Sequence, residues 1–297
     1  MMAGAQPAPE VARVRSRALA GQQRAARAAA IAERHENLAA AGSEPLRGLH
    51  LKIAAMHRLI QRRHGVAAAL HAEYADRLGA WLGRPERGGI RPIFMASVAR
   101  TLGSDSAALM LLSADLDEIL AAASDGLARR AQDLEFTFRE GPARDAAISR
   151  SPVMADGTVF RNRWAHYGPA LAQLGVQAVA AVPLQLAEGS LGALTSFSIR
   201  PSAEVDLAAL GGVADTLAHA VLAAPEVTAS DEGVPPLGMF DDRDLRPVVH
   251  QAAGMLCVQA GCTISDALAL IRARAFADAE PVEATALRIV SGRLRLA

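Results

Sequence analysis

Two short stretches rich in glycine, proline and charged residues divide this chain of 297 residues into three parts. The first is Leu82–Gly89, and the second is residues 225–240, which combine proline and glycine with acids. Glycine and proline are the residues that most often interrupt helices and strands. We therefore expect three regions, residues 1–88, 91–224 and 241–297, joined by these linkers.

The first region has a helical pattern over residues 9–83, interrupted once at Ala41–Pro45. In its second half, apolar residues recur at alternating steps of about three and four, which is the spacing of a heptad seam. This pattern predicts a coiled coil or a helical hairpin. The seam consists of Leu49, Ile53, Met56, Ile60, Ala67, Leu70, Tyr74 and Trp81.

Four histidines lie beside this seam at intervals of seven residues: His50, His57, His64 and His71. Seven helical residues rise about 10.5 Å, so neighbouring members cannot share one metal ion on one helix. We therefore expect half-exposed flanking histidines rather than a metal site. Whether they tune assembly near neutral pH stays open.

Strand-like runs alternate with helical ones in the middle region, so we expect one α/β or α+β domain there. Helices are expected at residues 92–102 and 203–223. The runs that favour strands are Ala108–Leu112, Leu134–Phe138, Val176–Leu186 and Leu191–Ile199.

The middle region also lacks the usual patterns of an enzyme site. It contains no glycine-rich dinucleotide or phosphate loop and no G-x-S-x-G turn, and its acids form no obvious pair. Arg163 and Trp164 are candidates for lining a ligand pocket, although packing of the indole against a helix edge is the favoured interpretation. We expect no enzyme activity, no cofactor and no metal.

The tail divides into three helical pieces, each with one apolar stripe. Gly261 is suited to ending the first, Thr263 and Asp266 form a capping box for the second, and Pro281 opens the third. Cys257 and Cys262 lack the partners of a zinc site and are expected to pack as small side chains. The stripe residues are Val249, Ala252, Leu256, Ala267, Leu268, Ile271, Ala275, Val282, Ala286, Ile289 and Val290.

On these residues the tail, residues 241–297, resembles the ANTAR domain, the RNA-binding module of bacterial transcription antitermination regulators. The matching positions are Gln251–Ala252, Gly254–Leu256, Gly261–Thr263, Asp266–Ala267, Ile271–Arg272, Ala275–Phe276, Pro281–Val282, Ala286, Val290 and Gly292–Leu296.

Residues 91–224 resemble the GAF sensor domain that often precedes ANTAR. The supporting residues are Glu140–Pro142, Asp145–Ala146, Arg163–Trp164, Gly175–Val176, Val182–Leu184 and Leu191–Leu194. The sensor lacks the cysteine that bilin attachment requires and the signature of cyclic-nucleotide binding. The implied architecture is multidomain: an N-terminal helical, coiled-coil-like segment, a GAF-like α/β sensor and a C-terminal three-helix ANTAR-like domain.

The resemblance implies that the tails, usually as dimers, bind RNA hairpins with exposed loops and prevent a terminator hairpin from forming. Arginines can contact phosphate or stack on an unpaired base. The expected RNA contacts are Gln251, Gly254, Arg272, Arg274 and Arg288, with Arg272 and Arg274 pointing away from the buried stripe. Gly254 would permit close approach of a backbone or a nucleotide.

Charge and composition leave rival interpretations open. The tail from Leu245 onward holds six arginines against four acids, a modest excess for an RNA-binding domain, and Ala253 replaces a lysine that is frequent in the family. Three alternatives remain. The protein could be a non-enzymatic dimerisation protein with a small-molecule sensor, or an enzyme with its site in the sensor domain. In the third alternative, the basic residues 1–88 rather than the tail bind nucleic acid. Without a signal peptide or a long apolar run, we expect a cytoplasmic protein that is not in the membrane.

Overall fold

The computed structural model falls into two compact units, which we describe separately. The first comprises Met1–Gly103 and Ala208–Met239, and the second comprises Ser104–Leu207 and Phe240–Ala297. Within them the structure describes residues 9–41, 44–83, 93–113, 115–187, 189–200, 205–222 and 246–296.

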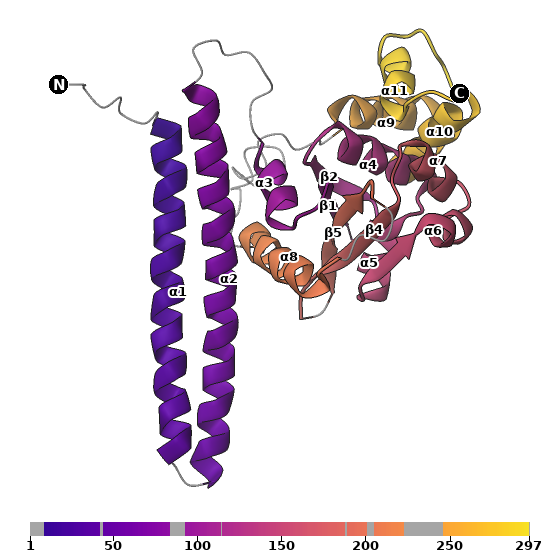
Figure 1. Ribbon diagram of the computed structural model, residues 1–297. Coiled ribbons are helices and arrows are strands. Elements are labelled where there is room, and N and C mark those ends of the chain that lie inside the picture. The colour runs from indigo at the N-terminus through magenta and orange to yellow at the C-terminus, as the bar shows by residue number, and fades with distance from the viewer. Residues whose placement is uncertain are drawn as a thin grey trace, which may run out of the picture. The chain divides into compact units, whose positions relative to one another are not determined.

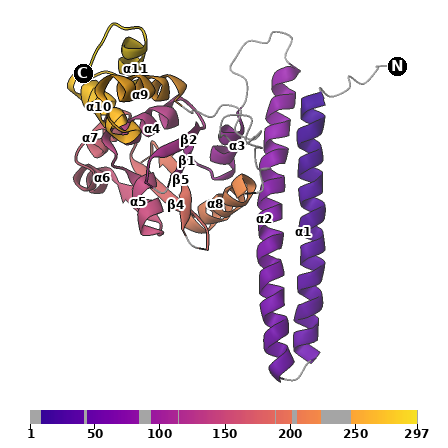
Figure 2. The ribbon, with the colours of Figure 1, turned by 180° about the vertical axis from the view of Figure 1, so that it is seen from behind.

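A long antiparallel hairpin of two helices forms most of the first unit (Figures 1 and 2). Helix α1 is Pro9–Ala41 and α2 is Glu44–Leu82, so the predicted break falls between them. The seam between the helices is built from small residues. A Cβ atom on Gly21 would lie 3.0 Å from the Cβ atom of Ala68, which shows how closely the two backbones approach. Buried members are Val11, Val14, Ala18, Ala28, Ala32 and Ala39 on α1 and Ala54, Ala68 and Ala75 on α2.

The apolar seam predicted for α2 is only partly the buried one. Leu70 and Tyr74 are buried, but Leu49 and Met56 are each 52% exposed. The reason is that α1 packs on the alanines of α2, Ala54, Ala68 and Ala75 among them, which are offset from the predicted seam. Small side chains allow the closest packing, so the larger residues are left on another face of the helix.

Two further helices complete the first unit, α3 at Phe94–Thr101 and α8 at Leu207–Leu222, close to the predicted ranges. The ring of Phe94 contacts His71 and Tyr74 edge-on, with centroids 5.7 and 5.9 Å apart, which fixes α3 on α2. Arg63 of α2 forms an ion pair with Asp215 of α8.

A five-stranded antiparallel sheet with the order β2-β1-β5-β4-β3 forms the centre of the second unit (Figure 1). Three of the four predicted strands are present, as β1, β4 and β5, whereas β2 and β3 were not predicted. The strands are β1 Ser106–Leu112, β2 Glu118–Ala123, β3 Val153–Asp156, β4 Ala178–Gln185 and β5 Ser190–Ser198.

Four short helices pack with the sheet around one apolar core that includes Phe160, Trp164, Tyr167 and Phe197. The predicted strand at Leu134–Phe138 is wrong, because these residues form the end of a helix. Asp125 caps that helix by accepting the backbone N–H groups of Leu127 and Ala128. The helices are α4 Gly126–Phe138, α5 Pro142–Ser149, α6 Gly157–Arg163 and α7 Tyr167–Gln173.

The tail forms the three predicted helices, α9 Pro247–Ala260, α10 Ile264–Ala277 and α11 Val282–Val290. Gly261 ends α9 with a φ of 61°, and Thr263 and Asp266 form the capping box of α10. Every predicted stripe residue is buried except Val290, which is partly buried. Phe136 of α4 belongs to the same core, and α10 packs directly on α4 (Figures 1 and 2).

Among the described residues, no single helix is long and apolar enough to cross a membrane. Helices α9 and α10 pass that test only when taken together, as a pair bent by 110°.

Candidate functional site

Two of the predicted RNA contacts, Arg274 and Arg288, meet at the surface of the three-helix tail. Arg274 Nε donates to Asp278 Oδ2 at 2.8 Å, and Arg288 Nη1 donates to the same oxygen at 3.0 Å. Arg288 also donates to Glu280 Oε1 at 2.7 Å. Hydrogen bonds from Arg274 and then from Arg288 lower the pKa of Asp278, so this carboxylate stays ionised. Helices α10 and α11 therefore hold two guanidinium groups around one anionic oxygen.

These two arginines are still accessible to solvent. Their side chains are 42% and 36% exposed, for Arg274 and Arg288 respectively. Ion pairs at such exposure contribute little to stability, so a competing anion can replace the carboxylate at small cost. Arg274 points away from the buried stripe as predicted, and both exposed guanidinium groups are engaged by acids.

Arg272 departs from its predicted orientation. Only 6% of the residue is exposed, and its guanidinium carbon lies 5.5 Å from the ring centre of Phe136. Burial first, and then the charge of Arg139, lowers the pKa of Arg272 to about 10. The prediction of an outward-facing side chain is wrong here, because Arg272 is one of the buried residues of α10. The face to which it turned is covered by α4, a helix from a distant part of the chain.

A second buried arginine, Arg246, contacts the same Phe136 ring. Its Nε donates to Glu118 at 2.6 Å and its Nη1 donates to Asp133 at 2.7 Å. The guanidinium carbon lies 4.2 Å from the ring centre of Phe136, and the side chain is 6% exposed. Two arginines therefore contact the Phe136 ring, and the charge of one is balanced by two carboxylates. Arg246 precedes Pro247 in the sequence, and nothing in its local pattern predicted this role.

Gln251 and Gly254 lie on α9, outside the pair of exposed arginines. Gln251 is exposed, and a Cβ atom added to Gly254 would meet nothing within 4 Å. Space in front of Gly254 is compatible with the predicted close approach of another molecule. Ala253, beside them on α9, is fully buried in the core of the tail.

An aromatic cluster that the sequence reasoning missed lies near Arg272. Phe138, His166 and Phe276 contact one another with ring centres 5.7–5.9 Å apart. They line a surface cleft of about 330 Å³ together with Arg139 and Arg272. Phe276 is 57% exposed. Phe276 lies outside the apolar stripe of α10, and this position in the sequence could have predicted that its ring faces solvent.

Arg163 and Trp164, the predicted pocket residues, form a packed arrangement in the second unit. The indole is 3% exposed and donates from Nε1 to Asp145 at 3.2 Å, while Arg163 forms an ion pair with the same carboxylate at 2.8 Å. The Arg163 guanidinium also lies 5.4 Å from the indole centre. These contacts match the packing interpretation, and the ligand-pocket role stays a prediction.

Glu135 of α4 is a buried acid, only 2% exposed. Its Oε1 accepts the backbone N–H of Arg144 at 2.8 Å. Burial raises the pKa of Glu135 to about 7, despite that hydrogen bond and the nearby charge of Arg144. Gly141 makes room for it, because a Cβ atom there would lie 2.6 Å from the Glu135 carboxyl carbon.

The described residues hold no group of three or more histidines, cysteines and acids that could bind a metal ion. Cys257 and Cys262 are free thiols, and both are half-buried against the core of the tail. That position agrees with the expectation that they act as small packing residues. The four spaced histidines of α2 are each half-buried, as expected for residues that flank a helical seam.

Comparison with known proteins identifies the middle of the chain. A family model described as a GAF domain matches residues 94–221, which include the five-stranded sheet. This chain therefore contains a GAF domain, and that part of the resemblance is confirmed. The match does not extend to α9–α11, so their resemblance to ANTAR stays a prediction.

The remaining comparisons add little. One solved structure similar to this chain is a domain assigned to a two-component sensor histidine kinase protein of Sinorhizobium meliloti 1021. The two are 17% identical with a TM-score of 0.35, over 43% of this chain and 85% of that one. No curated protein shows a significant match.

Proposed function

We propose that this protein is a non-enzymatic, cytoplasmic regulator in which the GAF domain senses a small molecule and the three-helix tail binds RNA hairpins. Binding would prevent a terminator hairpin from forming and allow transcription to continue. The proposal combines the GAF domain with the tail, whose three helices, caps and buried stripe are those of the ANTAR-like pattern.

The observation that carries the proposal is the convergence of Arg274 and Arg288 on one oxygen of Asp278, at 2.8 and 3.0 Å. A phosphate presents oxygens of the same kind, and guanidinium groups bind phosphate through paired hydrogen bonds. Because the arginines are exposed and their present pairs are weak, an RNA phosphate can take the place of the carboxylate.

Two neighbouring features provide the rest of an RNA surface. Phe276 lies two residues beyond Arg274, and its exposed ring can stack on an unpaired loop base. Arg293 and Arg295 follow α11 and are exposed, with no ion pair among the described residues. Pairing of two chains would double this positive charge, which answers the objection that one tail carries only a small excess.

We assign no direct contact to Arg272 in this proposal, because only 6% of it is exposed where it packs against Phe136. We therefore assign the phosphate contacts to Arg274 and Arg288 and treat Gln251 and Gly254 as a separate candidate surface on α9.

The test measures binding of a fluorescent RNA carrying two hairpins to the full-length protein, by anisotropy at several salt concentrations. We expect Arg274→Ala combined with Arg288→Ala to weaken RNA binding. The slope of log affinity against log salt concentration should become shallower by the contribution of about two phosphate contacts. Read-through of a terminator in transcription with purified polymerase should fall in the same variant.

A matched control removes two exposed arginines of the GAF domain, Arg130→Ala with Arg161→Ala, which change the net charge equally. This control should bind as the wild type does. Equal binding by the Arg274/Arg288 variant would reject these contacts, and no binding of hairpin RNA by the wild type would reject the function.

One observation favours a second candidate function, dimerisation without RNA binding. Leu49 and Met56 are 52% exposed although they belong to a heptad pattern, so a second copy of the chain can cover them. Light scattering after size exclusion should show a dimer that dissociates in Leu49→Glu with Met56→Glu. A dimer that binds no RNA would favour this alternative over the first proposal.

A further inference from the structure

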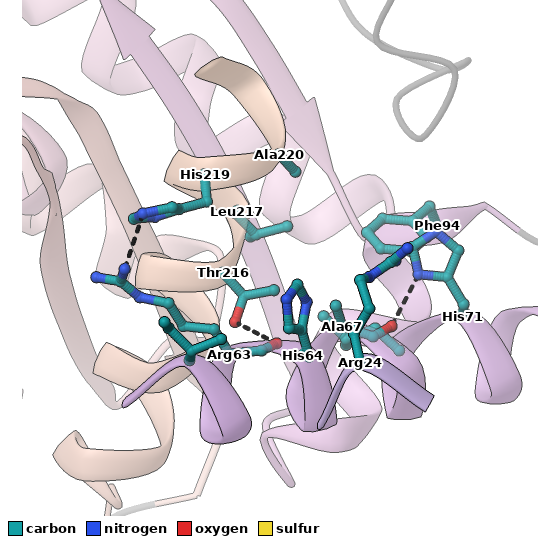
Figure 3. A pocket seen from close by; sticks show the side chains of 12 residues that line it. Arg24, Arg63, His64, Ala67, His71, Phe94, Thr216, Leu217, His219 and Ala220 are labelled. Atoms are coloured by element: carbon teal, nitrogen blue, oxygen red, sulfur yellow. Dashed lines mark hydrogen bonds between the residues drawn. The ribbon is translucent and has the colours of Figure 1, made fainter. Parts of the chain in front are cut away.

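A cavity of about 590 Å³ lies within the first unit, where α1, α2, α3 and α8 meet (Figure 3). Its volume falls in the range of small-molecule sites, roughly 300–1,000 Å³. Most of its wall is apolar, built by residues such as Ile60, Leu70, Phe94 and Leu217. Leu70 and Leu217 are each 1% exposed, so this wall belongs to the packed interior.

One side of the cavity mouth holds a charged group that is already balanced. Arg63 forms a two-point ion pair with Asp215, and its Nη1 donates to His219 Nε2 at 2.8 Å. His219 Nδ1 lies 3.0 Å from the backbone oxygen of Asp215, so the ring donates there and accepts from Arg63. The charge of Arg63 is balanced by the Asp215 carboxylate, and His219 lies beside Arg63 on this side (Figure 3).

The other side carries an unbalanced positive charge. Arg24 of α1 is exposed and has no carboxylate partner in the part of the chain that the structure describes. It faces His64 and His71, the last two members of the spaced histidine series. Burial, followed by the charge of Arg24, lowers the pKa of His64. Burial also lowers the pKa of His71, whose Nδ1 lies 2.8 Å from the Ala67 carbonyl oxygen, and Arg17 and Arg24 add to the effect.

We infer that this cavity binds a small amphipathic acid, a molecule with an apolar body and one carboxylate. The apolar body would occupy the wall formed by Leu70, Phe94 and Leu217, and the carboxylate would pair with Arg24. The positive charge of Arg24 favours an anionic ligand over a neutral one. An apolar wall beside this guanidinium group fits an anion with an apolar body. The inference rests on the small-molecule part of the proposed function, since Phe94 and Leu217 lie within the residues that match the GAF domain. The cavity does not include the arginines of the RNA-binding surface, so a failure of decanoate binding leaves RNA binding to be judged separately.

The experiment titrates the full-length protein with decanoate and, separately, with decan-1-ol, and follows binding by calorimetry and by the melting temperature. The wild type should bind decanoate and should bind the alcohol at least tenfold more weakly, since the alcohol lacks the charge-assisted hydrogen bond. Arg24→Gln should lose about tenfold in affinity for decanoate and little for the alcohol. The control Arg27→Gln, which changes an exposed arginine of the same helix outside the cavity, should bind as the wild type does.

A variant that fills the cavity tests its location. Ala67→Trp should abolish decanoate binding. If this variant loses its helical circular dichroism, and so does not fold, Ala220→Trp fills the cavity from the opposite wall and replaces it in the test. Four results would each overturn the inference. The wild type could fail to bind decanoate, or could bind decan-1-ol as tightly as decanoate. Arg24→Gln could bind decanoate as tightly as the wild type, or a folded tryptophan variant could still bind it. Loss of a dimer in Ala67→Trp, with no decanoate binding by the wild type, would identify the cavity as a subunit contact and also overturn it.

Discussion

Replacing Glu135 with glutamine should remove a pH dependence of stability that the structure assigns to one buried carboxyl. The pKa of Glu135 is raised by burial from 4.5 to about 7 in the folded protein. A folded pKa above the unfolded one means that the folded state binds the proton more tightly. The free energy of unfolding therefore falls as pH rises from about 4.5 to about 7 and changes little from this group above that window. At about 1.4 kcal/mol for each pKa unit, the total is about 3 kcal/mol.

The measurement is urea unfolding followed by the fluorescence of Trp164, which is buried in the same core as the residues around Glu135. A Trp81→Phe background removes the other tryptophan. Between pH 5 and 8, the wild type should lose about 2–3 kcal/mol relative to Glu135→Gln. Glu283→Gln, a change of an exposed acid on α11, is the control and should run parallel to the wild type. Parallel profiles for the wild type and Glu135→Gln would refute the assignment.

The same core and the contact between the tail and α4 give three further predictions. Arg246→Gln should destabilise the second unit by about 3 kcal/mol because it leaves Glu118 buried without its partner, and the added change Glu118→Gln should restore part of the loss in the same urea assay. Gly141→Ala should lower the melting temperature in calorimetry because its Cβ atom would clash with Glu135, and a melting temperature equal to that of the wild type would contradict the geometry. Ala68→Leu should open the hairpin of α1 and α2, with loss of helical circular dichroism on mild heating, because Gly21 leaves no room for a larger side chain.

The sequence was most informative where structure depends on neighbouring residues. The capping box of Thr263 and Asp266, the terminal glycine Gly261 and the apolar stripes predicted all three tail helices, because caps and helical periodicity are local features. The break between α1 and α2 was predicted for the same reason. The strands β2 and β3 were missed because short, alanine-containing segments have weak strand preferences and become strands only through pairing with distant partners.

The candidate site was harder to predict because it depends on contacts between distant segments. Arg272 was predicted to point away from the buried stripe of α10, but it is buried against Phe136, which comes from a helix more than a hundred residues earlier. The buried pairing of Arg246 with Glu118 has the same origin. Arg274 and Arg288 were predicted as exposed, yet their meeting at Asp278 required the relative placement of α10 and α11, which helical spacing does not provide.

The most direct test of the account is the affinity of the full-length protein for a two-hairpin RNA, compared between the wild type and the variant Arg274→Ala with Arg288→Ala. The account predicts tight, salt-dependent binding by the wild type and a weaker, less salt-dependent interaction in the variant, with Arg130→Ala plus Arg161→Ala unchanged. Indistinguishable titrations for all three proteins would contradict the claim that these two guanidinium groups hold RNA phosphate.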